Sequence, residues 1–214
     1  MKFCYNNGKK IKFLVLDMKK IYFLLLLSLK VFAYSPEYII NSIKYVATQE
    51  AVKPEILYTI IKIESDFEPF AISFLTNQTN AHYFKTLETP NINIKISQYS
   101  LNPQKWVVSI KPINEAYATE IAKALIQSGF SIDVGLGQLN SVNFKQNEIA
   151  MAFNPVFNLT KCAKVLRMCF NAKNKDIQKT IECYNYGLKK RNSMPYYKKF
   201  ITNYEKMFGN PYGN

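Results

Sequence analysis

One carboxyl group in this sequence is placed where it could act as a general acid. Leu57, Ile60, Ile61 and Glu64 occupy positions i, i+3, i+4 and i+7, so a helix would put Glu64 on the same face as three aliphatic side chains. Burial disfavours the charged form of a carboxyl group and raises its pKa. Such a group can hold a proton near neutral pH and donate it to a leaving group. The alternative is a glutamate at a helix end that simply reaches water.

The first 33 residues have the composition of an export segment. Lys19 and Lys20 follow Met18, the apolar run Ile21–Ser28 comes next, and Val31-Phe32-Ala33 offers a cleavage site. The apolar run is short for a helix that spans a membrane. We therefore expect a signal peptide within residues 1–33, with Met18 favoured as the start of translation, and an exported, periplasmic domain over residues 34–214. An uncleaved segment that tethers this domain to the inner membrane stays open as an alternative.

The charge of the chain is basic but not arranged for nucleic acid. Residues 1–33 hold seven lysines and one aspartate, so their removal lowers the formal net charge from +13 to +7. The longest basic run is Lys189-Lys190-Arg191, and no nucleic-acid motif is present. An exported basic protein fits an anionic polymer of the cell envelope, such as peptidoglycan with its peptide carboxylates. We expect no metal or cofactor, because Cys-x-x-Cys pairs are missing and His82 is the single histidine.

The positioning elements are mostly helical. Proline at helix starts, glycine at helix ends and apolar residues at helical spacing predict about six helices. They begin at Pro36, cover 54–64 and 115–128, begin at Pro155, cover about 177–187, and begin at Pro195. Ile92, Ile94 and Ile96 alternate with polar residues, as do Trp106, Val108 and Ile110, which predicts a small antiparallel ribbon. Trp106 is either a core residue or one on which a sugar ring stacks. Length and composition, 214 residues of which 48% are hydrophobic, predict one globular domain, and the expected helices and ribbon make it α+β and predominantly α-helical.

Four short motifs, in this order, resemble the soluble lytic murein transglycosylase (SLT) family, which has a lysozyme-like fold. Glu64-Ser65 followed by Pro69, Ala71 and Ser73 matches the family's Glu-Ser-x-x-x-Pro-x-Ala-x-Ser signature, and the stretch 135–140, Gly-Leu-Gly-Gln-Leu-Asn, resembles Gly-Leu-Met-Gln-Ile-Asn.

The other two motifs lie further along the chain. Asn154-Pro155 with Asn158 resembles the family's Asn-Pro…Asn-Ile helix start, and the stretch 183–187, Cys-Tyr-Asn-Tyr-Gly, resembles Ala-Tyr-Asn-x-Gly. Gly137 stands where the family has Met, and Cys162 and Cys183 replace small residues. The helix that leads into Asp133-Val134-Gly135 is similar to the lytic transglycosylase subunit of type IV secretion and conjugation systems, which would make secretion or conjugation subunits the partners.

The resemblance implies an enzyme that cleaves the β-1,4 bond between N-acetylmuramic acid and N-acetylglucosamine and forms a 1,6-anhydro product. It implies Glu64 as the catalytic residue and Ser73, Gln138, Tyr184 and Asn185 as residues that bind the glycan strand. Tyr184 as a core aromatic is the alternative for that residue. A non-catalytic assembly factor that binds peptidoglycan and a hydrolytic lysozyme-type muramidase are the alternatives for the whole chain.

The three cysteines beyond the export segment allow one disulfide in an exported protein. If the turn of the hairpin over residues 155–186 centres near residue 173, Cys162 and Cys183 lie level on two antiparallel helices. Cys162 and Cys169 lie two turns apart on one helix, which is too far for a bond. We therefore predict a Cys162–Cys183 disulfide, with three buried free thiols as the alternative.

Overall fold

The computed structural model describes residues 5–6, 9–10, 34–189 and 192–209. The chain divides into two compact units, Met1–Phe32 and Ala33–Asn214. In the first unit, β1 (Tyr5–Asn6) pairs antiparallel with β2 (Lys9–Lys10). The apolar run and the cleavage site of the predicted signal peptide lie outside the described residues.

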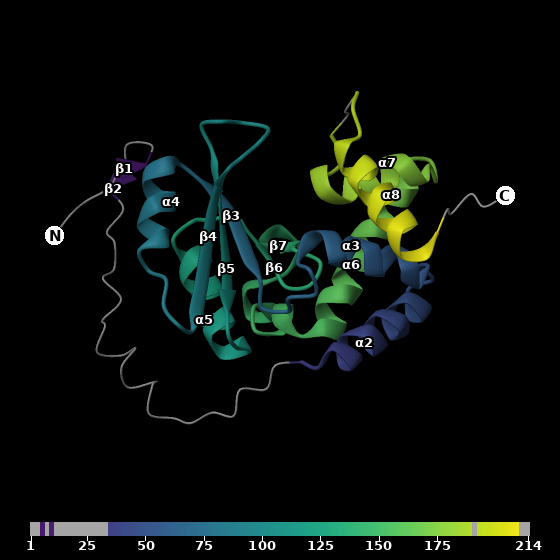
Figure 1. Cartoon of the computed structure of the whole chain (residues 1–214), viewed down its shortest axis with the longest axis horizontal. Helices are drawn as coiled ribbons and strands as arrows, with labels where there is room; N and C mark the ends of the chain where they lie inside the picture. Colours follow the sequence, from purple (N-terminus) through teal and green to yellow (C-terminus); the bar gives the residue numbers. More distant parts are fainter. Residues whose placement is uncertain (1–4, 7–8, 11–33, 190–191, 210–214) are drawn as a thin grey trace. The chain divides into compact units, whose positions relative to one another are not determined.

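The second unit combines α-helices with one antiparallel sheet (Figure 1). Its helices are α2 (Pro36–Gln49), α3 (Pro54–Glu64), α4 (Gln78–Lys85), α5 (Glu115–Gln127), α6 (Pro155–Ala172), α7 (Ile177–Tyr186) and α8 (Pro195–Phe208). Its strands are β3 (Ile72–Thr76), β4 (Ile92–Gln98), β5 (Trp106–Pro112), β6 (Ile132–Val134) and β7 (Leu139–Asn140), and short 3-10 helices occupy Ser141–Asn143, Gln146–Glu148 and Met151–Phe153. The domain is therefore α+β and predominantly helical, as the sequence predicts.

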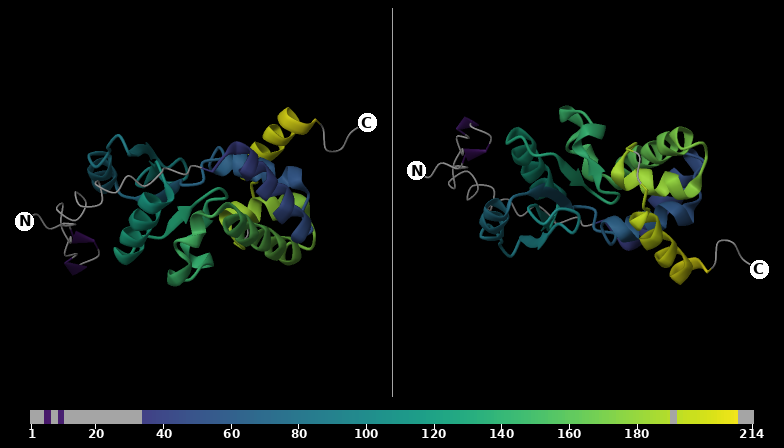
Figure 2. Two further views of the ribbon diagram at one scale, coloured as in Figure 1. Left: turned by 90° about the horizontal axis from the view of Figure 1, so that it is seen from below. Right: turned by 90° about the horizontal axis from the view of Figure 1, so that it is seen from above.

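The predicted helices are confirmed nearly to the residue. Pro36, Pro54, Pro155 and Pro195 each begin a helix, where a missing backbone N–H costs nothing. Gly187 ends α7 with φ +75°, a conformation that glycine adopts without strain. Helices α2, α3, α6, α7 and α8 gather on the side away from the hairpin β4–β5 in all three views (Figures 1 and 2).

The predicted ribbon is confirmed as the hairpin β4–β5, in which Ile94 faces Ile110 and Ile96 faces Val108. It is part of a larger sheet with the strand order β4-β5-β3-β6-β7. Strands β3, β6 and β7 were not predicted, because β6 and β7 are shorter than a recognisable alternating pattern and β3 follows directly on the Glu64 motif. Helix α4 was also missed, because its sequence is polar and it buries only Ala81.

One face of the sheet forms a core with α4 and α5. Phe74, Val108 and Ile132 on this face are fully buried. Trp106 packs against the same core, with its ring 5.0 Å from that of His82, so the interpretation as a core residue applies. A second core joins α2, α3, α6, α7 and α8. Helix α3 belongs to the second core and leads into β3 of the first, so it joins the two cores.

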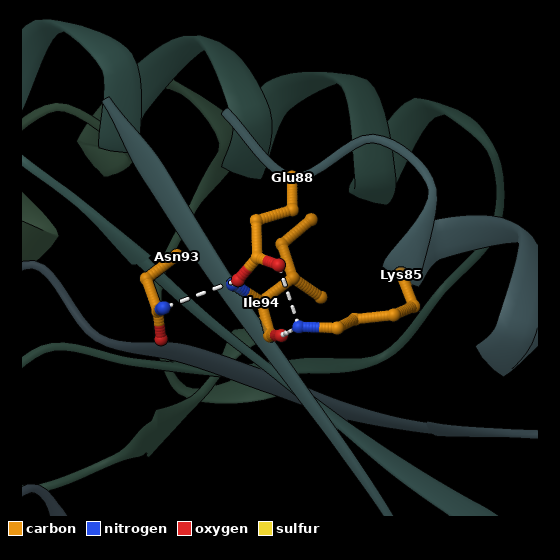
Figure 3. Close-up of polar contacts among 4 residues, drawn as sticks. All are labelled: Lys85, Glu88, Asn93 and Ile94. Carbon is orange, nitrogen blue, oxygen red and sulfur yellow. Dashed lines mark hydrogen bonds and ion pairs between the residues drawn. The ribbon is translucent and has the colours of Figure 1, made fainter. Parts of the chain in front are cut away.

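Side chains close the free edge of the sheet at β4 (Figure 3). Glu88 accepts a hydrogen bond of 3.0 Å from the Ile94 N–H, and Lys85 donates one of 2.7 Å to the Ile94 carbonyl. Lys85 also forms an ion pair with Glu88, and Asn93 donates to the same carboxylate. Because these groups occupy the edge, the outer backbone of Ile94 cannot pair with a strand of another molecule.

The predicted disulfide is wrong: Cys183 pairs with Cys169, and Cys162 is a free, buried thiol. The loop of the hairpin covers residues 173–176, between α6 and α7, so position along the two helices leaves both Cys162 and Cys169 as candidate partners for Cys183. Height along the helices therefore does not decide the pairing, and the direction of the side chains does. Cys162 points toward Asn158, with 3.6 Å between its sulfur and Oδ1, whereas Cys169 faces α7.

The disulfide generates a stability prediction for a protein that begins at residue 34. Replacing Cys183 with Ser should lower the free energy of unfolding by about 3 kcal/mol, because the bond closes a loop with a sequence separation of 14 residues. Urea unfolding of the wild type with and without reductant, beside Cys183→Ser and the control Cys162→Ala, measures this. Reductant should weaken the wild type and Cys162→Ala alike and leave Cys183→Ser unchanged. Three free thiols in the denatured, unreduced protein would contradict the pairing.

Candidate active site

Glu64 is the last residue of α3, and a sharp turn follows it. Ser65 caps the helix, and Asp66 and Phe67 both take the left-handed conformation, with φ +56° and +64°. Non-glycine residues adopt this conformation at a cost, so two in succession mark a turn that the surrounding structure enforces. The turn leads into β3 and brings Ser73 back alongside the end of α3.

Glu64, Ser73 and Gln138 line one cleft of about 190 Å³. Its other walls come from the end of α3 and from Ser109 and Lys111 on β5. Three of the five predicted site residues thus line this cleft, and a fourth, Asn185, is hydrogen-bonded to Glu64. A larger hollow of about 660 Å³ lies beyond the turn and shares Lys111 with the cleft, but no predicted site residue lines it.

The surroundings of Glu64 keep its carboxyl group protonated up to about neutral pH. Removal from water raises its pKa to about 7, against the lowering effects of hydrogen bonds from Tyr196 and Asn185 and of the positive charge of Lys199. The negative charge of Asp133 adds to the rise. The side chain is only partly exposed, at the end of the apolar stripe that the sequence predicts. This is the electrostatic state that a general acid needs.

Tyr196 is a site residue that sequence reasoning missed. It is 6% exposed in the first turn of α8, and its hydroxyl donates a hydrogen bond to Oε1 of Glu64. Burial and the neighbouring Glu64 hold the pKa of Tyr196 well above its ordinary value, so it stays a donor. It lies 132 residues from Glu64 in sequence, and no local pattern signals the contact. A signal that could have pointed to Tyr196 is its polar hydroxyl on the inward, apolar face of a helix, because a buried hydroxyl needs a hydrogen-bond partner.

Gln138 and Ser73 are tied to each other. The Ser73 hydroxyl donates a 2.7 Å hydrogen bond to the Gln138 amide oxygen, and the Gln138 amide nitrogen donates to the Gly135 carbonyl at 3.0 Å and more weakly to Ala71. Gln138 has φ +47°, a strained conformation for a non-glycine residue. The amide thus joins β3 to the 135–138 loop and fixes the cleft wall.

Asn158 on α6 holds the 135–138 loop through hydrogen bonds to its backbone. It is fully buried on α6. Its amide accepts a 2.9 Å hydrogen bond from the Gly137 N–H and donates to the Val134 and Ala152 carbonyls, each at 2.9 Å. A buried amide with three satisfied hydrogen bonds fixes the backbone around it, because breaking any of them leaves a polar group unpaired. Asn158 is therefore a positioning residue for the cleft.

Gly137 is explained by its neighbours on α6 and α7. A Cβ atom on Gly137 would lie 2.4 Å from the Cys162 sulfur and 2.9 Å from the Tyr184 hydroxyl. Tyr184 donates a 2.7 Å hydrogen bond to the Gly137 carbonyl, and burial raises the pKa of the Cys162 thiol to about 12. The space that a methionine side chain would need at position 137 is thus filled by Cys162 and Tyr184.

The remaining predicted residues lie at different depths. Asn185 is exposed at the end of α7 and hydrogen-bonds Glu64. Tyr184 lies behind the loop, does not line the cleft, and packs partly against the helical core. The alternative for Tyr184, a core aromatic, therefore describes most of its contacts, while its hydroxyl supports the loop.

Asp133 is the second carboxyl group near the cleft. It lies on β6 directly opposite Ser73 on β3, and it accepts a 2.8 Å hydrogen bond from Asn140. Burial raises its pKa to about 6. Asp66, by contrast, is exposed and paired with Lys62. No group of three or more metal-binding side chains occurs in the described part of the chain.

The helical domain, the small sheet and a single protonated glutamate at the end of a helix define a lysozyme-like domain. The family model described as Transglycosylase SLT domain matches residues 41–204, so the chain belongs to this family. Its members are lytic transglycosylases that act on peptidoglycan in the periplasm or cell wall. No curated protein and no solved structure matches the chain. Among the helices that the structure describes, none has the length and apolar character that crossing a membrane requires.

The packing at Gly137 predicts a coupling between two positions. Gly137→Ala should lower the free energy of unfolding by about 2 kcal/mol, because the added methyl group overlaps the Cys162 sulfur. In a Cys162→Ala background the same change should cost less than half as much, because the sulfur is gone. Urea unfolding of the four proteins of this double-mutant cycle gives the coupling. An equal cost of Gly137→Ala in both backgrounds would reject the packing explanation.

The raised pKa of Glu64 predicts a pH dependence of stability. In the unfolded chain this carboxyl group loses its proton near its ordinary pKa of 4.5, but in the folded protein it does so only near 7. The contribution of Glu64 to the stability of the folded protein is therefore fully present below pH 4.5 and is lost as the pH rises to about 7. Glu64→Gln should remove this loss. The free energy of unfolding of the variant minus that of the wild type should therefore be larger at pH 8 than at pH 4 by on the order of 2 kcal/mol, a value that allows for the partial exposure of the side chain. Parallel curves for the two proteins would contradict the shift.

Proposed function

We propose that this chain is an active lytic transglycosylase that cleaves the β-1,4 bond between N-acetylmuramic acid and N-acetylglucosamine and leaves a 1,6-anhydro end. The observation that carries the proposal is the protonated Glu64 at the wall of a cleft, in a chain that belongs to the transglycosylase family. Glu64 has the two properties that the reaction requires of its acid, a proton at neutral pH and access to the cleft.

Glu64 donates its proton to the leaving oxygen in the first step. The bond between the anomeric carbon and that oxygen breaks, and positive charge develops on the sugar ring. The Glu64 carboxylate then accepts a hydrogen bond from Tyr196 and lies near Lys199, and both interactions favour its charged form. The protonated and ionised forms of Glu64 are thus close in free energy near neutral pH, which suits a group that must donate a proton and then accept one.

The second step uses the substrate's own hydroxyl group. Glu64, now a carboxylate, takes the proton of the 6-hydroxyl of the muramic acid residue, whose oxygen attacks the anomeric carbon. Because nucleophile and electrophile belong to one sugar, the attack is intramolecular and gains from proximity. One carboxyl group serves both steps.

We propose that Ser73, Gln138 and Asn185 contact the N-acetyl groups and that Tyr184 acts through the loop that carries Gln138.

We further propose that the enzyme is exported and opens the cell wall for a secretion or conjugation apparatus. The segment with Lys19, Lys20 and the apolar run Ile21–Ser28 supports export, and the sequence before Gly135 supports the secretion branch. Subunits of that apparatus are the proposed partners, and an uncleaved segment would tether the enzyme to the inner membrane.

Asp133 is the observation that favours a second candidate, a hydrolytic muramidase. A hydrolase that inverts the anomeric centre needs a carboxylate that activates water. Asp133 is the carboxyl group whose charge acts on Glu64. Its hydrogen bond from Asn140 and its place opposite Ser73 are also consistent with a structural role in the sheet.

Product analysis separates these candidates. Protein starting at residue 34 should release anhydro-muropeptides from murein sacculi, measured by chromatography and mass, and Glu64→Gln should reduce the rate by at least about a thousandfold, because it removes the proton donor. Asp133→Asn should keep the anhydro product. Reducing-end products that disappear in Asp133→Asn would establish the hydrolase. Binding to sacculi without any product would support a non-catalytic assembly factor.

A further inference from the structure

The sheet has a second face, and its outer part on β4 is exposed. Along β4 and β5, buried residues alternate with more exposed ones. The core face packs against α4 and α5, whereas Asn93, Lys95 and Ser97 on the other face of β4 are all exposed. Leu75 on β3, which also points to this face, is 40% exposed. We call this surface the open face.

One row of polar side chains crosses the open face from edge to edge. In the register of the sheet, Lys95 lies opposite Ser109, Ser109 opposite Ser73, Ser73 opposite Asp133, and Asp133 opposite Asn140. Directly opposed residues in antiparallel strands point to the same face. The row therefore contains Ser73 of the cleft and reaches outward to Lys95.

The open face is continuous with the cleft. Ser73, Ser109 and Lys111 line the cleft together with Glu64. Lys95 lies two strands from Ser73, which is about 10 Å at the usual strand spacing. This distance is close to the length of one disaccharide repeat of a glycan strand. A strand cleaved at Glu64 can therefore extend over this surface without leaving the protein.

Two lysine side chains, Lys95 and Lys111, lie on the outer part of this face. Lys95 is exposed and Lys111 is partly buried, and Lys111 pairs in register with Asn93, next to Lys95. Neither lysine forms an ion pair with any other residue that the structure describes. The neighbouring carboxyl groups are Glu88, beside Asn93 and paired with Lys85, and Asp133, at the inner end of the row. Asp66 in the turn is paired with Lys62, and the charge of Lys111 also acts on it. The outer end of the face is thus positively charged.

We propose that the open face, through Lys95 and Lys111, binds the carboxylates of the peptide stems that hang from the glycan strand beside the cleft. The inference rests on the proposed function, because it takes peptidoglycan as the polymer in the cleft. Charge complementarity selects the occupant: each stem peptide carries carboxylates that extend away from the sugars, whereas a glycan strand without peptides keeps only the lactyl carboxylate of each muramic acid, close to the sugar ring. The hydroxyls of Ser73 and Ser109 then contact the sugars, and the lysines distinguish peptide-bearing from bare strands.

Binding by the inactive Glu64→Gln protein tests the proposal without turnover. The probes are peptide-bearing glycan strands and the same strands stripped of peptides by an amidase, with the lactyl carboxylates that this cleavage frees converted to amides. In this background, Lys95→Ala and Lys111→Ala should each weaken binding of peptide-bearing strands about twofold to fivefold, as expected for partly exposed ion pairs. Lys95→Arg should keep the affinity, and Lys164→Ala on α6 is the charge-matched control. Binding of stripped strands should change in none of them.

The outcomes separate this inference from the proposed function. Equal affinity for the two probes, or loss of affinity in Lys164→Ala as large as in Lys95→Ala, overturns the peptide-stem site. If the active protein still cleaves stripped strands to anhydro products in that case, the proposed function stands alone. If the active protein cleaves neither strand while Lys95 and Lys111 still select peptide-bearing strands, the surface stands and the catalytic proposal fails.

Discussion

The structure depends on the desolvation of one carboxyl group at the end of a helix. The apolar stripe of α3 packs into the helical core, and Glu64 is carried into that environment by its place in the stripe. Burying an ionised carboxylate is costly, so the group keeps its proton. Tyr196, Asn185 and Lys199 offset part of that cost, which leaves the pKa near 7 and not higher. The packing of α3 into the core therefore also determines the protonation of Glu64.

The other wall of the cleft is held by hydrogen bonds to backbone. Asn158 fixes the loop from below, Tyr184 holds the Gly137 carbonyl, and Gln138 joins the loop to Ser73. These side chains come from α6, α7 and the loop itself, which lie far apart in sequence. Gly137 and Cys162 fit each other in this arrangement, so the exchange of a methionine for glycine is matched by a larger residue on α6.

Helices and the acid could be predicted from the sequence because their signals are local. Pro54 and the stripe that ends at Glu64 define α3, and alternation defines the hairpin β4–β5. The unpredicted parts depend on contacts across the chain. Tyr196 meets Glu64 only when α8 packs on α3, and the short strands β6 and β7 form only because β6 pairs with β3 and β7 pairs with β6. The cysteine pairing was missed for a related reason, since the direction of the side chains and not their height along the helices selects Cys169.

Sequence motifs also named residues without saying what they touch. Gln138, predicted as a substrate contact, lines the cleft, and its amide is also engaged with Ser73 and Gly135. Tyr184 was predicted to line the cleft, but it supports the loop from behind. Both residues hold the cleft wall in place, and this role depends on contacts between several elements that lie far apart in sequence.

The most direct test is the pKa of Glu64 itself. Titration of its side-chain carboxyl carbon by NMR in the folded protein, assigned by comparison with Glu64→Gln, measures it without substrate. A midpoint near 7 is the predicted result, because desolvation outweighs the hydrogen bonds and the charge of Lys199. A midpoint at the ordinary value of 4.5 would show a solvated carboxylate and would contradict the role of Glu64 as the proton donor.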